Sequence, residues 1–421
     1  MNYPDSVHFL YALGNEIKTV KLGLERIRAV LDALGRPQER CRFVHVAGTN
    51  GKGSTCAMIE SALRASGKRT GLFTSPHLAE PTERIRIDGR PIAAENFAAA
   101  FNRVHRVVEE LIETGAIDMH TTYFETVTAM ALLVFAEQAL DVVVLEVGLG
   151  GRLDATNVVA PELCVITPVD FDHEQYLGRS LEAIAGEKAG ILKPGTRAVF
   201  ARQRPEAAAV LERRAAELGI AVSRTSECDV ANVKLDARGS RFEFLGSRID
   251  CPLAGEHQVE NAVTAAVALS RLGVAFDAIR EGIAQTRWPG RLELVSEHPE
   301  IIVDGAHNPA GARALARYIE RFYARRRVRL IYGAMRDKAV EEIAGILFPL
   351  AWQVIVTAPR QSRALAPEAL RDVAAHPNLQ VAARLEEALN LVRGAGDENA
   401  VFITGSLFLV AEARALLGQL L

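Results

Sequence analysis

The sequence predicts a two-domain α/β protein, and three observations carry this prediction. Short β-branched runs alternate with longer amphipathic stretches, a pattern typical of a doubly wound parallel sheet covered by helices. A glycine-rich turn follows the first predicted strand and opens a helix. A second strand–helix series begins near residue 300. We therefore expect an N-terminal phosphate-loop domain over residues 1–293 and a smaller, Rossmann-like α/β domain over residues 294–421.

Each predicted element rests on a local pattern. The run LDVVVLEV at 140–147 is continuously apolar, as expected for a parallel strand buried on both faces. The turn-rich segment WPGR at 288–291 precedes the domain boundary. In the first domain we expect strands at 42–47, 69–74, 140–147 and 163–169, and helices at 53–66 and 124–138. In the second we expect strands at 301–304, 328–332, 353–357 and 401–404, and a helix at 310–323.

Composition excludes several classes of protein. With 421 residues, the chain is long enough for two or three domains. A net charge of -3 gives no electrostatic reason to expect nucleic acid or a membrane surface as a partner. The densest basic run, 325–329, is interpreted as a solvated helix end before a strand. No apolar stretch approaches the length that spans a bilayer.

Cysteine usage indicates a reducing compartment. Five cysteines are scattered along the chain, at positions 41, 56, 164, 228 and 251, and none forms a CxxC pair or zinc spacing. The N-terminal residues lack the basic and apolar run of a signal peptide. We therefore expect a cytoplasmic protein.

The most specific local motif is GTNGKGST at 48–55, between a predicted strand and a predicted helix. Glycines let backbone N–H groups turn inward, and the helix N-terminus adds positive potential, so the turn suits a phosphate group. Lys52 is expected to contact the β- and γ-phosphates, and Ser54 or Thr55 to supply a hydroxyl. The motif departs from the general pattern because Val46 stands where glycine is usual and Gly53 follows the lysine. The alternative is a plain strand-to-helix turn.

Four predicted strands end in polar residues suited to Mg-ATP. Ligands of open α/β sheets bind outside the carboxyl ends of the strands. The four ends carry the phosphate loop, Ser75 in TSPH, Glu146 before GLGGRLDATN, and His173 in DFDH. Magnesium prefers oxygen ligands, and a carboxylate on an apolar strand fits that preference.

Each of these residues also has a plainer interpretation. Glu146 could pair with a lysine or arginine at the strand end, Ser75 could cap a turn, and His173 could be a structural histidine. Lys188 in GEKAGILKPG reads, by itself, as a surface lysine of a helix.

The motifs together resemble a known family. GTNGKGS, TSPHL, TYFE, EVGLGGRLDATN, DHEQYLG, EKAGILK, GEHQVENA, WPGRLE and DGAHNP occur in the order seen in bacterial folylpolyglutamate and dihydrofolate synthases, members of the Mur ligase superfamily. The resemblance runs from about residue 40 to the C-terminus. It implies an ATP-dependent ligase that joins L-glutamate to dihydropteroate and to reduced folates through an acyl phosphate.

The resemblance also implies residue roles. It gives Lys52, Glu146, His173, Lys188 and Arg291 roles in catalysis. It assigns ATP to Gly48, Thr49, Asn50, Gly51, Lys52, Gly53, Ser54, Gln258, Asn261, Arg291, Asp304 and His307. It assigns two Mg²⁺ ions to Ser75, Glu146, His173 and a carbamylated Lys188, and the pterin substrate to Thr122, Phe124, Gly151, Arg152 and Asp154.

Three alternatives remain beside this interpretation. The enzyme could carry only one of the two folate activities. A Mur-type peptidoglycan ligase usually places a nucleotide-sugar domain before the phosphate loop, and only 47 residues precede Gly48 here. An ATP-hydrolysing switch would share the phosphate loop but would not need the second domain with DGAHNP. The expected partners are small-molecule substrates, without nucleic acid or membrane, and the family expectation is a monomer.

Overall fold

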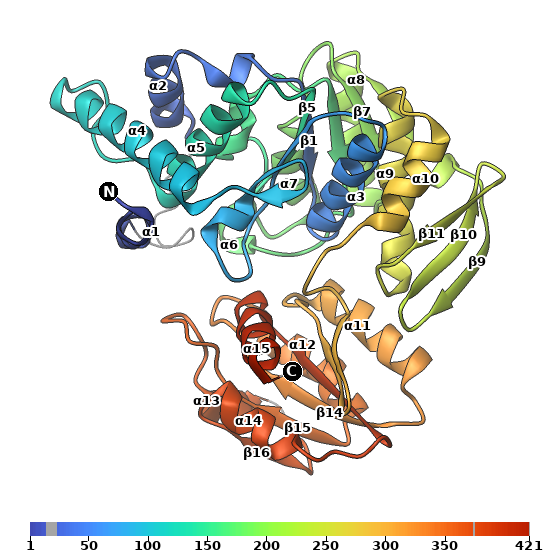
Figure 1. The fold of residues 1–421 in the computed structure, drawn as a ribbon. Coiled ribbons are helices and arrows are strands. Elements are labelled where there is room, and N and C mark those ends of the chain that lie inside the picture. Colours follow the sequence, from blue (N-terminus) through green and yellow to red (C-terminus); the bar gives the residue numbers. More distant parts are fainter. Residues whose placement is uncertain (14–22, 374, 421) are drawn as a thin grey trace. The chain divides into compact units, whose positions relative to one another are not determined.

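The chain folds into two compact units, each assembled from separate segments (Figure 1). The computed structural model describes residues 1–13, 23–373 and 375–420. Unit 1 contains Met1–Val169, Ser180–Cys228 and Asn261–Gln285. Unit 2 contains Asp170–Arg179, Asp229–Glu260 and Thr286–Leu421. The boundary between residues 293 and 294 stays a prediction, since the chain enters the second unit at two earlier points as well.

Unit 1 is built on an eight-stranded sheet in the order β4-β3-β2-β5-β1-β6-β7-β8. The six strands from β2 to β8 are parallel to their neighbours, and β3 and β4 add an antiparallel edge. The strands are β1 (Phe43–Ala47), β2 (Thr70–Phe73), β3 (Ile85–Ile87), β4 (Arg90–Pro91), β5 (Val142–Glu146), β6 (Leu163–Ile166), β7 (Arg197–Phe200) and β8 (Ala221–Arg224).

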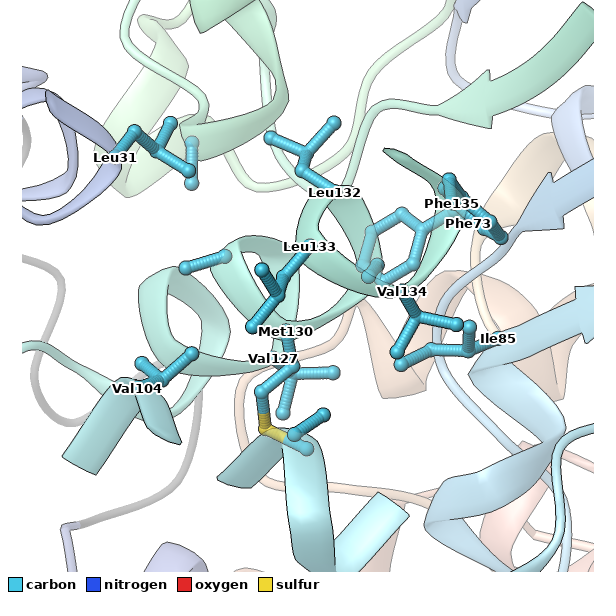
Figure 2. Close-up of a cluster of buried hydrophobic side chains, with 14 of the residues drawn as sticks. Leu31, Phe73, Ile85, Val104, Val127, Met130, Leu132, Leu133, Val134 and Phe135 are labelled. Carbon is cyan, nitrogen blue, oxygen red and sulfur yellow. The ribbon is translucent and has the colours of Figure 1, made fainter. Parts of the chain in front are cut away.

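One face of this sheet supports a large apolar core (Figure 2). Val127, Met130 and Phe135 of α5 pack with Phe73 of β2 and Val104 of α4 in this core. Helix α5 is buried along nearly its whole length, which is why its sequence is apolar on all sides. The helices of unit 1 are α1 (Tyr3–Ala12), α2 (Glu25–Ala33), α3 (Lys52–Ala65), α4 (Ala94–Glu113), α5 (Tyr123–Glu137), α7 (Leu181–Ala189), α8 (Pro205–Glu217) and α10 (Phe276–Gln285).

Helix α3, which begins at the phosphate loop, is packed closely by α10. A Cβ atom added to Gly282 would lie 2.1 Å from the Ala62 Cα atom, so only glycine permits this approach. The Ser61 hydroxyl donates to the Gly282 carbonyl at 2.7 Å. The C-terminal half of α3 is thus packed against a helix more than two hundred residues away in the sequence.

Unit 2 contains two sheets. A three-stranded antiparallel sheet has the order β11-β10-β9, and a six-stranded mixed sheet has the order β12-β13-β17-β14-β15-β16. The strands are β9 (Val230–Asp236), β10 (Gly239–Phe244), β11 (Ser247–Cys251), β12 (Glu293–Glu297), β13 (Glu300–Val303), β14 (Arg327–Tyr332), β15 (Gln353–Val356), β16 (Leu379–Val381) and β17 (Asn399–Thr404). The helices are α6 (Glu174–Leu177), α11 (Pro309–Phe322), α12 (Val340–Leu347), α13 (Pro367–Val373), α14 (Leu385–Val392) and α15 (Leu407–Leu420), and α9 (Glu256–Arg271) continues from unit 2 into unit 1.

The predicted α/β fold and every predicted element are confirmed, with ends that differ by at most a few residues. The sheet β9–β11 was not predicted. The interpretation of the basic run at 325–329 as a solvated helix end before a strand is wrong, because its last three residues lie in β14 and Arg326 pairs with Glu300 at 3.1 Å. Within the described part of the chain, no helix is both long and apolar enough to cross a membrane.

Candidate functional site

The phosphate loop joins β1 to α3 at the carboxyl edge of the unit 1 sheet. Thr49 N–H donates to the Pro168 carbonyl, which follows β6, at 3.0 Å. Helix α3 begins at Lys52, so its first N–H groups face the loop. The predicted strand–loop–helix context is therefore confirmed, and the turn has the geometry that binds anions at a helix N-terminus.

Two loop glycines are required by close contacts and by backbone conformation. Gly51 has φ 85°, and a Cβ atom there would lie 2.2 Å from the Asn261 side-chain oxygen. Gly48 has φ 149°, and a Cβ atom there would lie 1.8 Å from the Thr167 hydroxyl. Side chains at these positions would push apart the loop, β6 and α9. The contact also places Asn261, predicted to bind ATP, against the loop.

Two lysine side chains meet at one carbonyl oxygen of the loop. Lys52 Nζ donates to the carbonyls of Gly48 and Thr49, both at 3.1 Å. Lys188 Nζ donates to the same Gly48 carbonyl at 2.9 Å, and its side chain is only 3% exposed. The interpretation of Lys188 as a surface lysine is therefore wrong. Its buried amine instead reaches the phosphate loop across 140 residues of sequence, and its role in the site stays a prediction.

The GLGGRLDATN loop brings Lys188 to this position. Arg152 N–H donates to the Glu187 carbonyl of α7 at 2.8 Å, and a Cβ atom at Gly151 would lie 2.7 Å from the same oxygen. A Cβ atom at Gly190 would lie 2.3 Å from the Arg152 Cβ atom. The glycines in this loop and in EKAG thus let loop and helix pack backbone to backbone, next to Lys188.

Glu146 lies at the end of β5, between β2 and β1 in the sheet. Its carboxylate accepts a hydrogen bond from Ser75 N–H at 3.0 Å, and its side chain is buried, at 4% exposure. Burial, and then the charge of Glu146, raise the pKa of the nearby Cys56 thiol well above its ordinary value. Three of the four predicted strand ends, on β1, β2 and β5, therefore converge.

The residues predicted to bind the pterin have structural partners. Thr122 caps α5, and its hydroxyl accepts from Glu125 N–H at 3.2 Å. The Phe124 ring lies against Gly148, where a Cβ atom would come within 2.5 Å. Arg152 pairs with Glu187 at 2.8 Å. Their role in substrate binding stays a prediction.

Asp154 is buried and organises its own loop. Its carboxylate accepts from Leu149 N–H at 2.8 Å and from Thr156 N–H at 3.0 Å. The Thr156 hydroxyl donates to the same carboxylate and contacts His45 Nε2 at 2.8 Å. Burial raises the pKa of Asp154 and lowers that of His45 to about 3. These hydrogen bonds between the side chains of Asp154, Thr156 and His45 hold the GLGGRLDATN loop in place.

In unit 2, the segments WPGRLE and DGAHNP are joined by hydrogen bonds to the Asp304 carboxylate. Asp304 accepts from Leu292 N–H and from Ala306 N–H, both at 2.9 Å. A Cβ atom at Gly305 would lie 2.3 Å from Arg291 Nη1, so the guanidinium lies directly on this glycine. Burial raises the pKa of Asp304, and the charge of Arg291 opposes that rise.

Asp172 is a second polar centre of unit 2. Its carboxylate accepts from Lys338 Nζ at 2.7 Å and from the Asn308 amide at 3.1 Å, and His307 Nε2 lies 3.7 Å away. Burial alone would raise the pKa of Asp172, but its interactions with His307 and Lys338 outweigh burial and hold the pKa far below its ordinary range. Lys338 Nζ is also 3.5 Å from His173 Nε2.

The sequence prediction missed Lys338 and Asn308. Lys338 comes after the end of β14, and polar residues after strand ends were the signal that selected candidate residues in the first domain. Asn308 lies within the DGAHNP motif itself. His173, predicted as a metal ligand, belongs to unit 2, whereas Glu146, Ser75 and Lys188 belong to unit 1. Gln258 and Asn261 are both buried on α9.

Two family models match the chain. The Mur ligase middle domain matches residues 46–269, and the Mur ligase glutamate ligase domain matches residues 290–407.

Known proteins match over nearly the whole length. The Bacillus subtilis dihydrofolate synthase/folylpolyglutamate synthase is 37% identical, over 94% of this chain and 95% of its own. A Mycobacterium tuberculosis folylpolyglutamate synthase structure complexed with ADP and AMPPCP has a TM-score of 0.91 at 35% identity, covering 99% of each chain. Escherichia coli FolC in complex with DHPP and ADP has a TM-score of 0.89 at 32% identity, covering 100% of this chain and 98% of its own.

Proposed function

Because the chain belongs to the Mur ligase family and matches dihydrofolate and folylpolyglutamate synthases from end to end, we propose that it attaches L-glutamate to dihydropteroate and to reduced folates at the expense of ATP. It is an ATP-dependent ligase with small-molecule substrates. The observation that supports its site best is the convergence of the phosphate loop, Glu146 and Lys188 at one edge of the sheet.

The chemistry follows from the weakness of a carboxylate as an acylating agent, because its leaving group would be oxide. Transfer of the γ-phosphoryl group to a carboxylate oxygen releases ADP and gives an acyl phosphate. The glutamate nitrogen then attacks the acyl carbon, phosphate leaves, and the nitrogen loses its proton to give the amide. The protein has to position the reactants, offset charge and exclude water.

The residues present suit these tasks. The backbone of residues 48–54 and Lys52 would hold the ATP phosphates, and Asn261 lies against the same loop. Gln258, close to Asn261 on α9, is proposed with it near the adenine. Arg291, Asp304 and His307 are assigned to the nucleotide by the family resemblance. Arg291 supplies a positive charge that can offset the transferring phosphoryl group.

The donors also fit magnesium. Ser75 and the buried carboxylate of Glu146 are hard oxygen donors next to the phosphate loop, as Mg²⁺ requires. When bound, the ion would offset charge on the γ-phosphoryl group. A second ion is proposed at Glu146, His173 and Lys188. An unmodified lysine amine does not fit beside a cation, so this second site requires the carbamylated form of Lys188.

We further propose a monomeric cytoplasmic enzyme with both folate activities. Support for the compartment comes from the five cysteines, none of which is paired in a disulfide. A monofunctional dihydrofolate synthase or folylpolyglutamate synthase is the alternative.

A product assay tests the proposal. Purified protein receives ATP, magnesium, labelled L-glutamate and either dihydropteroate or a tetrahydrofolate. We expect labelled amide and an equal amount of ADP with each pterin substrate. Amide from only one of them would reduce the proposal to a single activity. ATP hydrolysis that ignores both co-substrates and forms no amide would contradict the ligase assignment.

Glu146→Gln provides the first variant for this assay. It keeps the shape of the side chain but removes the charge proposed to bind magnesium, so turnover should fall by about 10²–10³-fold or more. Glu162→Gln is the matched control, since this glutamate pairs with Arg42 on the protein surface and should leave turnover unchanged. Near-normal turnover of Glu146→Gln at ordinary magnesium concentrations would show that the metal assignment is wrong.

A further inference from the structure

Two histidines and a glutamate outside the proposed active site converge where α4 connects to α5. His105 and Glu109 are one turn apart on α4, and His120 precedes the cap of α5 (Figure 1 labels both helices). One potential ligand atom from each residue lies within 4.8 Å of the other two. The three residues belong to unit 1 and have no role in the ligation described above.

The distances between the donors suit a small divalent ion. His105 Nδ1 and His120 Nε2 are 3.3 Å apart, and His105 Nδ1 and Glu109 Oε1 are 3.9 Å apart. Zn–N bonds of about 2.0–2.1 Å in a tetrahedral site place two nitrogen ligands about 3.3 Å apart. The Glu109 side chain is 51% exposed, so its carboxylate is free to move the remaining few tenths of an ångström.

The surroundings orient His120 as a metal ligand. Its Nδ1 lies 2.9 Å from the Thr121 carbonyl, which can only accept, so Nδ1 carries the proton and Nε2 presents its lone pair towards His105. The two rings are also held by packing. Phe9 lies against His105 and His120, with ring centroids 4.7 and 5.4 Å apart, and Phe101 stacks on His105 at 5.5 Å.

We propose that His105 Nδ1, Glu109 Oε1 and His120 Nε2 form a zinc-binding site that ties α4 to the segment preceding α5. Two imidazoles and one carboxylate are a ligand set that zinc commonly takes, and the fourth position is left to water. The ion would fix the stretch that leads into Thr122.

The test uses the full-length protein, stripped of metal with a chelator and titrated with Zn²⁺ alone against a chromophoric indicator. Glu109→Gln and His120→Gln each remove one ligand. Glu109 is half exposed, so its variant tests the site without disturbing the core. His298→Gln is the matched control, because His298 also faces a carboxylate, that of Asp397, but on an exposed surface of unit 2.

We expect the wild type and His298→Gln to bind one equivalent of zinc that both ligand variants bind at least tenfold more weakly. Magnesium-site residues such as Glu146 also accept zinc, so this difference between variants, rather than total uptake, identifies the site. Cobalt(II) gives a second readout, as visible absorption of a four-coordinate ion should be lost in Glu109→Gln. Equal zinc affinity and stoichiometry in all four proteins would overturn the proposal, as would failure of the wild type to bind zinc at equimolar concentration. The histidine pair would then be a hydrogen bond only.

Discussion

At the scale of single residues, Lys188 brings a positive charge to the phosphate loop. Its amine is buried and donates to the Gly48 carbonyl. Carbamylation would turn this amine into a carboxylate close to the phosphate loop, and thereby reverse the local charge from one that repels magnesium to one that attracts it.

We therefore expect Lys188→Ala to fold but to lose nearly all ligase activity, at least about 10²-fold. Small carboxylic acids such as acetate should restore part of the activity by occupying the vacated space. Rates of ADP release with and without acetate, together with circular dichroism, measure both effects.

Lys193→Ala is the control for this experiment. Lys193 is a nearby, half-buried lysine whose amine donates to the Asn157 and Val159 carbonyls, a structural role. Its loss should lower stability without creating a response to acetate. Normal activity in Lys188→Ala, or equal rescue of both variants, would contradict the carbamate assignment.

The buried side chain of His45 makes the stability of the fold depend on pH. It is fully buried, and burial lowers its pKa to about 3, compared with about 6.5 in an unfolded chain. Below pH 6.5 the unfolded chain therefore binds a proton that the folded protein does not, so stability falls as pH falls from about 6.5 towards 3.

Between pH 7 and pH 5 this single group should remove about 2 kcal/mol of stability. His45→Gln can still hydrogen-bond Thr156 but does not titrate, so its loss of stability over the same interval should be smaller by that amount. Urea unfolding followed by fluorescence at both pH values measures the difference, and the exposed His298→Gln serves as control. Parallel pH profiles for wild type and His45→Gln would refute the assignment.

At the scale of elements, the contact between α3 and α10 depends on the missing side chain of Gly282. A methyl group there would lie 2.1 Å from the Ala62 Cα atom, so the helices would have to separate. We expect Gly282→Ala to destabilise unit 1 by about 1–3 kcal/mol, as overpacked cores do. Thermal unfolding measures this loss.

Gly186→Ala is the matched control for Gly282→Ala. Gly186 lies inside α7, and a Cβ atom there meets nothing within 4 Å. Relief of the helix penalty of glycine should make this variant more stable by about 0.5–1 kcal/mol. If both variants gave the same change in the midpoint temperature of thermal unfolding, the packing argument would be wrong.

The elements show what local sequence can and cannot predict. The strands β1, β2, β5 and β6 were predicted because apolar runs and a glycine turn are local signals. The adjacency of β2, β5 and β1 in the sheet makes their ends converge. The hairpin of β10 and β11 was missed. Its turn residues, Leu245 and Gly246, both have positive φ, but the usual Asn-Gly or Asp-Gly signal is absent.

Contacts between distant residues could not be predicted in the same way. Lys338 and Asp172 are 166 residues apart, and no spacing or periodicity links them. The structural role of Asp154 was also hidden, because a buried carboxylate that bonds its own loop looks in sequence like one that binds a substrate. The family resemblance supplied the residue list of the site, and the structure supplied the partners.

At the scale of the whole molecule, the chain passes back and forth between the two units. The predicted C-terminal domain, residues 294–421, lacks three stretches that unit 2 contains, residues 170–179, 229–260 and 286–293, and Asp172 lies in the first of them. Without Asp172, the Lys338 ammonium and the buried Asn308 amide lose a partner. Without residues 229–260, Tyr318 loses the Ala237 carbonyl that it bonds at 2.8 Å.

A fragment of residues 294–421 should therefore be less stable than the same residues in the intact protein, by several kcal/mol. Hydrogen exchange of the β14 amides, measured in fragment and intact chain, should be at least tenfold faster in the fragment. Asp172→Asn in the intact chain, which removes only the charge, should lie between the two. Equal protection of β14 in fragment and intact chain would show that 294–421 is an independent domain.

The contact between Ser61 and Gly282 also bears on the order of events at the ribosome. Helix α3 emerges early, but the helix that covers it is made about 220 residues later. At a translation rate of about 5–20 residues per second, α10 is synthesised roughly 10–45 s after α3. The nucleotide-binding half of the enzyme, although encoded first, is completed only after the three-stranded sheet of the other unit has been translated. A nascent chain that stops before Gly282 therefore lacks the contact that packs α10 against α3.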